Sequence, residues 1–283
     1  MRKLKDYGEL IKFQHTIFAI PFGLASIAVL AKEVPPSERI LWIVVALILA
    51  RTAGMAFNRL IDLPYDALNP RTKNWVHASG RVSKKEIITI ALLSSALFVV
   101  SCYFINILAL LLSPAVVALL ILYPYGKRFT HFPHFILGAV YLVIPLGVDV
   151  ALNESISPEA ITLGVAMATW VSGFDILYAL QDVEFDKRQG LKSLPVLLGV
   201  KGSLRTARIL HLITLTSLIL LGIQSDRLSY IYFIGLVPIS TFLMYEHSIV
   251  KEDDLSRLNK AFFTVNGYIS VAFLLVVLAD VIL

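Results

Sequence analysis

Residues 57–66 read FNRLIDLPYD and residues 180–186 read LQDVEFD, and each stretch closes a long apolar segment. The two stretches carry oxygen-bearing side chains at four-residue spacing: Asn58, Asp62 and Asp66 in the first, Asp182 and Asp186 in the second. Four-residue spacing places side chains on one face of a helix. Carboxylates are costly near a bilayer and are usually kept there for function. The sequence therefore predicts two acidic helix ends that meet at one functional site.

The chemistry of these side chains indicates a site for Mg²⁺ and a diphosphate. Mg²⁺ takes oxygen ligands and bridges to the phosphates of a substrate. Pro64 predicts a helix break inside the first cluster, which allows Asp66 to lie on a loop. In the second cluster Asp175 lies seven residues before Asp182, so a continuous helix would place Asp175, Asp182 and Asp186 on one face.

The composition is that of an integral membrane protein. Of its 283 residues, 57% are hydrophobic and only 16% are charged, and the mean hydropathy is +0.77; a soluble domain carries roughly 25% charged residues. Apolar segments of helix length recur from end to end, which indicates one domain over residues 1–283. The basic N-terminal segment lacks a cleavage site of the A-x-A kind, so we expect a retained first helix. Cys102 is the only cysteine, so no disulfide forms within one chain.

The fold expected is all-α, with nine transmembrane helices around a central chamber. The nine spans lie near residues 14–32, 39–60, 86–104, 107–125, 134–152, 160–181, 206–222, 229–247 and 262–282. The weakest divisions are those between the third and fourth and between the seventh and eighth spans.

Charge alternation between the loops predicts the orientation. Loops after the even-numbered spans are rich in lysine and arginine, whereas the opposite loops are mixed or acidic. The positive-inside rule then places the N-terminus and both acidic clusters at the cytoplasmic face of the cell inner membrane. The net charge of +5 follows from these loops, so no nucleic-acid partner is expected. No obligate protein partner is predicted.

Three long motifs carry a resemblance to a known family. Residues 58–83, NRLIDLPYDALNPRTKNWVHASGRVS, resemble the first aspartate-rich motif of the UbiA superfamily of intramembrane prenyltransferases. Residues 122–138, LYPYGKRFTHFPHFILG, resemble its tyrosine–lysine segment. Residues 173–199, GFDILYALQDVEFDKRQGLKSLPVLLG, resemble its second aspartate-rich motif. Their order and spacing also agree, and the chain is most similar to the 4-hydroxybenzoate polyprenyltransferase branch.

The resemblance implies Mg²⁺-dependent transfer of a polyprenyl group from polyprenyl diphosphate to an aromatic ring in quinone biosynthesis. By motif, Mg-diphosphate would be held by Asn58, Asp62, Asp66, Asp182 and Asp186. Asp62, Asp182, Lys127 and Asp175 would be catalytic. Substrate contacts would come from Asn58, Arg71, Lys73, Arg128, Tyr123, Tyr178 and Arg51, with Arg128 the candidate for the carboxylate of the acceptor. The lipid tail would lie among the apolar helices.

Departures from the branch leave the acceptor open. NWVHASG (74–80) replaces a common proline–leucine segment, and Phe185 stands where an acid is frequent. Residues 11–22 and 245–270 resemble a subgroup that makes menaquinone through futalosine, whose acceptor is 1,4-dihydroxy-6-naphthoate. Homogentisate, a haem or a glycerol phosphate lipid are further acceptors within the fold. A secondary transporter would instead need acids near the midplane, and a lipid-binding scaffold would not need both acidic clusters.

Overall fold

The computed structural model describes residues 2–12 and 16–283, and all secondary structure in this part of the chain is helical. The helices are α1 (Arg2–Leu10), α2 (Thr16–Leu30), α3 (Ser37–Asp66), α4 (Lys84–Ile105), α5 (Ile107–Phe129), α6 (Pro133–Asn153), α7 (Pro158–Ala179), the 3₁₀ turn η2 (Leu180–Asp182), α8 (Val183–Arg188), α9 (Leu194–Gln224), α10 (Tyr230–Ile249), the π-helical turn η3 (Lys260–Val265) and α11 (Asn266–Ile282).

Seven helices of the described part are long and apolar enough to cross a membrane. They correspond to α3, α4, α5, α6, α7 with its extension to Arg188, α9, and η3 with α11. The segment Phe18–Leu30 of α2 is apolar but shorter, and α10 is not among the seven. The all-helical, multi-pass prediction is confirmed, whereas the count of nine spans stays a prediction. The first residues of the span expected at 14–32 lie outside the described part.

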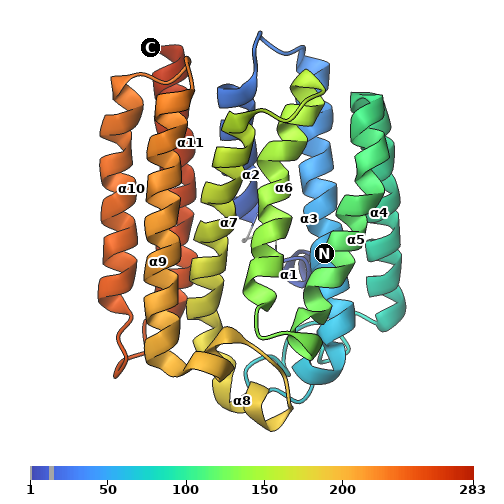
Figure 1. The fold of residues 1–283 in the computed structure, drawn as a ribbon. Coiled ribbons are helices and arrows are strands. Elements are labelled where there is room, and N and C mark those ends of the chain that lie inside the picture. Colours follow the sequence, from blue (N-terminus) through green and yellow to red (C-terminus); the bar gives the residue numbers. More distant parts are fainter. Residues whose placement is uncertain (1, 13–15) are drawn as a thin grey trace.

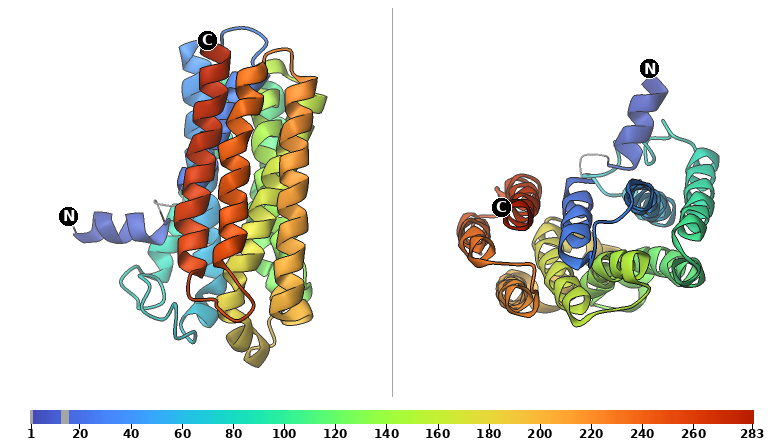
Figure 2. Two further views of the ribbon diagram at one scale, coloured as in Figure 1. Left: turned by 90° about the vertical axis from the view of Figure 1, so that its left-hand side faces the viewer. Right: turned by 90° about the horizontal axis from the view of Figure 1, so that it is seen from above.

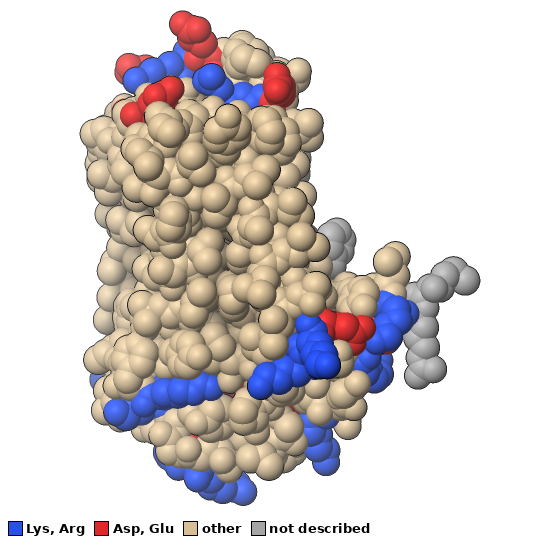
Figure 3. All heavy atoms as spheres, turned by 90° about the vertical axis from the view of Figure 1, so that its right-hand side faces the viewer, with Lys and Arg blue, Asp and Glu red and all other residues tan. Residues whose placement is uncertain are grey.

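The long helices stand side by side as a bundle, and α1 lies across them near one end (Figures 1 and 2). Successive helices pack against each other, and α2 packs against α11, α3 and α6. The loop from 67 to 83 and helix α8 share the lower end of Figure 1, so the residues after α3 and after α7 meet there. Charged side chains gather at the two ends of the bundle, with an uncharged belt between them (Figure 3).

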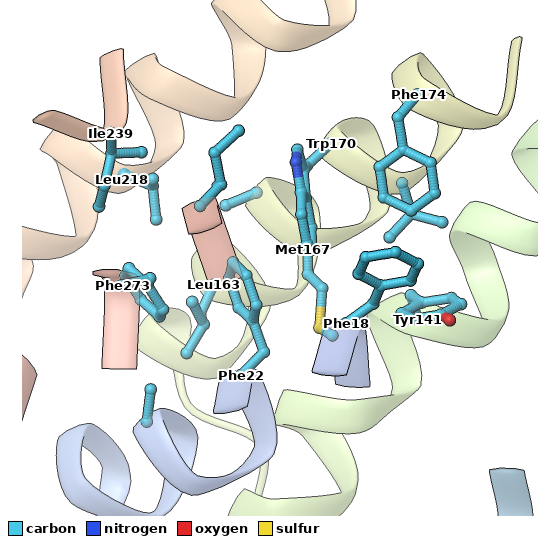
Figure 4. Packing of buried hydrophobic residues seen from close by; sticks show 14 of the residues in the cluster. Phe18, Phe22, Tyr141, Leu163, Met167, Trp170, Phe174, Leu218, Ile239 and Phe273 are labelled. Atoms are coloured by element: carbon cyan, nitrogen blue, oxygen red, sulfur yellow. The ribbon is translucent and has the colours of Figure 1, made fainter. Parts of the chain in front are cut away.

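An aromatic core fixes α2 against α7 and α11. The ring of Phe22 stacks on Trp170 at 4.9 Å and on Phe273 at 4.6 Å between centroids. Figure 4 shows these rings together with Phe18 and Phe174 of the same buried cluster. The indole Nε1 of Trp170 also donates a hydrogen bond of 2.7 Å to Asn266 Oδ1, which ties α7 to the start of α11.

Two predicted helix boundaries near the acidic clusters were wrong. Pro64 lies inside α3, which continues to Asp66. Pro64 has no N–H to donate to the carbonyl of Leu60, four residues earlier. The carbonyl of the next residue, Ile61, accepts a hydrogen bond of 2.7 Å from Arg128. The second cluster is not one continuous α-helix, because α7 ends at Ala179 and the 3₁₀ turn η2 precedes α8. The span expected at 206–222 lies in α9, whose helix is interrupted at Gly199, where φ is 67°.

Buried Asp149 joins the end of α6 to the start of α7. Its carboxylate accepts hydrogen bonds of 2.7 Å from both the backbone N–H and the hydroxyl of Ser157, the N-cap of α7. It also accepts a hydrogen bond of 2.6 Å from Asn153. The side chain thereby fixes the connection between two helices that line the site described below.

Replacing Asp149 by alanine leaves these buried donors without their acceptor. We expect Asp149→Ala to lower the free energy of unfolding by about 2 kcal/mol, measured by chemical or thermal unfolding in detergent. Glu33→Ala, an exposed acid at the same end, should leave stability unchanged. Equal stability of the two variants would contradict the role of Asp149.

Candidate active site

One cavity of about 740 Å³ brings the two acidic clusters together. Most of the side chains predicted for the site line it: Arg51, Asn58, Asp62, Asp66, Arg71, Tyr123, Lys127, Asp175, Tyr178, Asp182 and Asp186. Asp175, Asp182 and Asp186 therefore face one space although the helix that carries them is interrupted. The meeting of the two helix ends is the feature on which the site depends.

In the first cluster, Asp62 is held by cations from α5. Its Oδ2 lies 3.5 Å from Lys127 Nζ, and its Oδ1 lies 3.7 Å from Arg128 Nη2. The amide of Asn58, one turn earlier, donates a hydrogen bond of 3.2 Å to Oδ2. The Asp62 carboxylate is buried at 5% exposure, so these partners compensate a charge that would otherwise be costly to bury.

Asp66 is positioned by two residues that were not predicted as site residues. His77 Nε2 lies 2.8 Å from Asp66 Oδ2, and Arg59 Nη1 lies 3.8 Å from the same oxygen. His77 and Arg59 are both buried, at 3% and 7% exposure. The loop residue His77 thus fixes one rotamer of the carboxylate that ends α3.

In the second cluster, a bidentate pair connects Asp182 to the loop after α3. Arg71 donates from Nε to Asp182 Oδ1 at 2.9 Å and from Nη2 to Oδ2 at 2.5 Å. Asn69 adds a hydrogen bond of 3.0 Å to Oδ1. Burial alone would lower the pKa of Arg71, but the bond and charge of Asp182 raise it above its usual value. Arg71 is therefore a permanent cation that joins the two acidic clusters.

Three cations surround the indole of Trp75 beside these carboxylates. Lys12 Nζ lies 4.3 Å from the ring centroid, and the guanidinium carbons of Arg59 and Arg71 lie 4.5 Å and 5.3 Å from it. Such contacts with an aromatic face stabilise cations. Burial, followed by the charge of Arg59, lowers the pKa of Lys12. All four side chains line the cavity, which gives this end a concentrated positive charge.

Deeper in the cavity, Asp175 pairs with His134, and Tyr178 lies against an aromatic wall. His134 Nδ1 is 2.7 Å from Asp175 Oδ2. The ring of Tyr178 stacks on Phe262 of η3 at a centroid distance of 4.0 Å. The Tyr178 hydroxyl accepts a hydrogen bond of 3.0 Å from Arg71. The aromatic wall therefore connects directly to the cation that holds Asp182.

Two predicted substrate contacts do not line the cavity. Lys73 is exposed on the loop after α3. Arg128 approaches Asp62, but its guanidinium donates to the backbone carbonyls of Pro124 and Ile61. Arg51 does line the cavity, and its buried Nε has no hydrogen-bond partner. An anionic ligand in the cavity can therefore meet the Arg51 side chain.

The sequence analysis did not predict His134, His77 or Trp75 as site residues. The positions of these residues within the motifs were the available signal: His134 lies in the tyrosine–lysine segment, and Trp75 and His77 lie in the unusual stretch NWVHASG. Helix α3 ends at Asp66 and His77 lies in the loop that follows, so only the fold of the loop could reveal the pair. Lys12 lies in the segment after α1, far from both acidic clusters in the sequence, so spacing could not show that it lies beside them.

The donor set fits Mg²⁺ bound together with a phosphate. Asn58, Asp62, Asp66, Asp182 and Asp186 offer only oxygen ligands, which hard divalent cations prefer. In the described part of the chain no three His, Cys, Asp or Glu side chains form a metal cage. Mg²⁺ ordinarily takes one or two carboxylates and completes its coordination with substrate phosphates and water, so the two facing clusters suit an ion shared with a diphosphate.

Comparison with known proteins agrees with this geometry. The UbiA prenyltransferase family matches residues 19–270. A relative from Marinomonas sp. (strain MWYL1), named 4-hydroxybenzoate octaprenyltransferase, is 30% identical over 95% of this chain and 96% of its own length. A solved UbiA homolog from Aeropyrum pernix K1 has a TM-score of 0.84 at 30% identity and covers 94% of this chain and 98% of its own.

A second solved structure extends the likeness in fold. The UbiA homolog from Archaeoglobus fulgidus, bound to DMAPP and Mg²⁺, superposes with a TM-score of 0.75 at 18% identity over 98% of this chain and 99% of its own. The chain belongs to the UbiA prenyltransferase family and is an enzyme of the polyprenyltransferase type. The acidic side chains of the two clusters lie at one end of the bundle, whereas a transporter would require acids near the midplane.

The pairing of His77 with Asp66 predicts an effect on metal use. We expect His77→Leu to raise the Mg²⁺ concentration needed for half-maximal activity by about tenfold, because an unanchored carboxylate loses ligand geometry. His77→Gln keeps a donor and should restore most of the affinity. A titration of activity with Mg²⁺ measures both variants. An unchanged Mg²⁺ requirement in His77→Leu would contradict the positioning role.

Proposed function

We propose that this protein transfers a polyprenyl group from a polyprenyl diphosphate to a hydroxy-aromatic acid, with Mg²⁺, in quinone biosynthesis. One observation carries the proposal. Two acidic clusters and their cations line one end of a cavity whose remaining walls are mostly apolar. That division matches a donor with a charged head and a long hydrocarbon tail.

The charged end would hold the diphosphate. Asp62 and Asp66 from α3 and Asp182 and Asp186 from the second cluster, with Asn58, would bind Mg²⁺, which when bound neutralises phosphate charge and helps the diphosphate to leave. Lys127 and Arg71 would contact the phosphate oxygens, with further positive charge from Lys12 and Arg59 around Trp75. Because these groups are in place before the reaction, they stabilise the negative charge that develops on the leaving diphosphate in the transition state.

The apolar part would hold the tail. Along α3 the lining runs from Ile43 to Asp66, which is roughly 34 Å at the rise of an α-helix. This length is close to the thickness of the hydrocarbon core of a bilayer, about 30 Å. A long isoprenoid chain can therefore lie inside the bundle while its diphosphate remains at the end that carries the carboxylates.

The reaction breaks the bond between the diphosphate oxygen and the first carbon of the prenyl group, and the electron pair leaves with the diphosphate. The allylic cation that remains would lie near Tyr178 and Tyr123, whose faces attract positive charge. An aromatic ring carbon then forms the new carbon–carbon bond. The ring proton lost in this step would pass to the carboxylate of Asp175, which His134 orients.

The acceptor that we favour is 4-hydroxybenzoate, the acceptor in the names of relatives from Marinomonas and Francisella at 30% identity. Arg51 would hold its carboxylate, because its side chain lines the cavity and its Nε has no protein partner. Arg128, whose guanidinium donates to backbone carbonyls, is a weaker candidate for this role than the sequence indicated. 1,4-Dihydroxy-6-naphthoate, which carries the same carboxylate, is the alternative.

We further propose that the lower end of Figure 1 faces the cytoplasm of a cell whose inner membrane holds the protein. The loops at this end carry most of the lysines and arginines that the positive-inside rule uses. The N-terminal helix α1 lies near the same end (Figure 2). Water-soluble acceptors and Mg²⁺ would then reach the carboxylates from the cytoplasm.

A product assay tests the proposal. Purified protein with Mg²⁺ and geranyl diphosphate is offered 4-hydroxybenzoate and 1,4-dihydroxy-6-naphthoate separately, and products are identified by mass spectrometry. We expect prenylated 4-hydroxybenzoate, and its loss in EDTA. Asp62→Asn and Asp182→Asn should lower the rate by at least about a thousandfold, because each removes a carboxylate ligand of the Mg²⁺ that neutralises the leaving diphosphate. If product formed only with the naphthoate, the assignment of 4-hydroxybenzoate as the acceptor would be wrong, and the assignment of the reaction as prenyl transfer would stand.

The assignment of Arg51 predicts a selective change in acceptor affinity. We expect Arg51→Gln to raise the KM for 4-hydroxybenzoate by about ten- to a hundredfold, because the variant loses one charge-assisted hydrogen bond to the carboxylate. The KM for geranyl diphosphate should change much less. Arg39→Gln, an exposed cation on the same helix outside this cavity, is the control. A larger change in the donor KM than in the acceptor KM would assign Arg51 to the diphosphate instead.

A further inference from the structure

The aromatic wall of the candidate active site includes a π-helical turn. Helix α11 is preceded by η3, in which residues Lys260–Val265 form the wide π turn. Such turns are rare and occur frequently at functional sites. Phe262 and Phe263 of η3 both line the cavity, and the ring of Phe262 stacks on Tyr178 at 4.0 Å. A π turn takes more residues than an α turn, so it changes which side chains of the segment face the cavity.

The side chain of Asn266 closes this turn. Its Nδ2 donates a hydrogen bond of 3.0 Å to the carbonyl of Ala261 and another of 2.7 Å to Glu246 Oε1. Its Oδ1 accepts a hydrogen bond of 2.7 Å from the indole N–H of Trp170. An indole N–H can only donate, so the oxygen of the amide must face Trp170 and both amide N–H groups are used. The backbone immediately before Phe262 is therefore tied to α7 and α10 through one side chain.

The partners of Asn266 belong to a buried polar network that joins four helices. Glu246 of α10 is 1% exposed, and Trp170 of α7 and Asn266 of α11 are fully buried. The carbonyl of Trp170 lies 3.2 Å from His211 Nε2 of α9, and His211 Nδ1 lies 2.9 Å from His247 Nε2 of α10. A carbonyl only accepts, so His211 donates through Nε2, and in a neutral ring its Nδ1 accepts from His247. None of these five side chains lines the cavity.

This network fixes the position of η3 along α7. In an apolar bundle, buried polar groups are stable only in an arrangement that satisfies their hydrogen bonds. Helix α7 carries both Trp170, which holds Asn266, and Tyr178, on which Phe262 stacks. Two contacts along one helix set the register of the π turn. The Tyr178 hydroxyl in turn accepts a hydrogen bond from Arg71, so the network reaches the charged end of the cavity through the aromatic wall.

We propose that Asn266 is a positioning residue for the prenyl transfer step. By holding the π turn at the carbonyl of Ala261, it keeps Phe262 on Tyr178, and the resulting aromatic wall excludes water from the allylic cation. The inference rests on the proposed function and adds a residue outside the cavity that controls the fate of the cation. Asn266 acts through Phe262, because Phe262 lines the cavity and Asn266 does not.

Two products report whether water reaches the cation. In transfer, an aromatic ring carbon forms the new carbon–carbon bond and the ring loses a proton. In hydrolysis, the oxygen of water forms a bond to the same prenyl carbon and loses a proton, which gives the prenyl alcohol. A closed site suppresses hydrolysis of reactive intermediates. Both reactions consume one prenyl diphosphate and release one diphosphate, so the alcohol's share of the products measures the access of water and not the amount of folded enzyme.

The share of geraniol is measured on the full chain with Mg²⁺, geranyl diphosphate and 4-hydroxybenzoate, after subtraction of the alcohol formed in EDTA. We expect Asn266→Leu, which keeps a branched side chain and removes the amide, to raise this share by about tenfold. Thr214→Val is the matched control, because Thr214 is also buried and pairs with Thr169 of α7 at 2.9 Å, a contact that involves no residue of η3. A share unchanged in Asn266→Leu, or raised equally in the control, would overturn the proposal.

Two variants of Glu246 perturb the same amide from the other side and keep the test decisive where Asn266→Leu does not fold. Glu246→Gln retains an oxygen that accepts the hydrogen bond from Asn266, so it should keep the wild-type share of geraniol. Glu246→Leu removes that oxygen and should raise the share severalfold. Equal shares in the two variants would contradict a positioning role of the network.

A double variant tests whether Asn266 acts through Phe262. Phe262→Leu should by itself raise the share of geraniol, and adding Asn266→Leu should raise it no further, because the wall is already lost. A larger share in the double variant than in Phe262→Leu would overturn this route. The absence of prenylated acceptor in the wild type is a separate result, which would overturn the proposed function and this inference with it.

Discussion

The bidentate bond between Arg71 and Asp182 is the interaction on which the site depends. It joins the loop after α3 to the turn after α7, segments more than a hundred residues apart in the chain. Without a cation between them, carboxylates gathered at one end of an apolar bundle would repel one another and would be costly to bury. The same guanidinium also contacts Tyr178 and Trp75, so the charged end and the aromatic wall share one anchor.

The balance of charge explains how this end of the bundle can prepare for a diphosphate. Lys127, Arg59, Arg71 and Lys12 lie among the carboxylates, and they are held by α5, α3, the loop after α3 and the segment after α1. Cations gathered in this way supply a potential that attracts phosphate. In the proposed binding mode, the apolar walls above them would separate the tail from water. The two parts of an amphipathic substrate would then lie one after the other along the axis of the bundle.

Sequence was most informative where chemistry follows local spacing. Composition and apolar segments predicted the all-helical membrane fold, and the motifs around Asp62, Lys127 and Asp182 predicted one site for both acidic clusters, because these signals depend on residues that are near one another in the chain. The sequence analysis failed where a contact depends on loop geometry. Three-dimensional packing determines that His77 pairs with Asp66. It also determines that the Arg128 guanidinium donates its hydrogen bonds to backbone carbonyls. The effect of Pro64 was misjudged because α3 continues through the proline to Asp66.

The central claim is that both acidic clusters hold one metal–diphosphate together. An experimental structure with Mn²⁺ and a non-hydrolysable analogue of geranyl diphosphate tests it most directly, since the anomalous signal of Mn²⁺ locates the metal. The account predicts metal between the side chains of Asp62 or Asp66 and those of Asp182 or Asp186, with the diphosphate against Lys127 and Arg71 and the prenyl group toward Tyr178. Metal and diphosphate bound away from either cluster would contradict it.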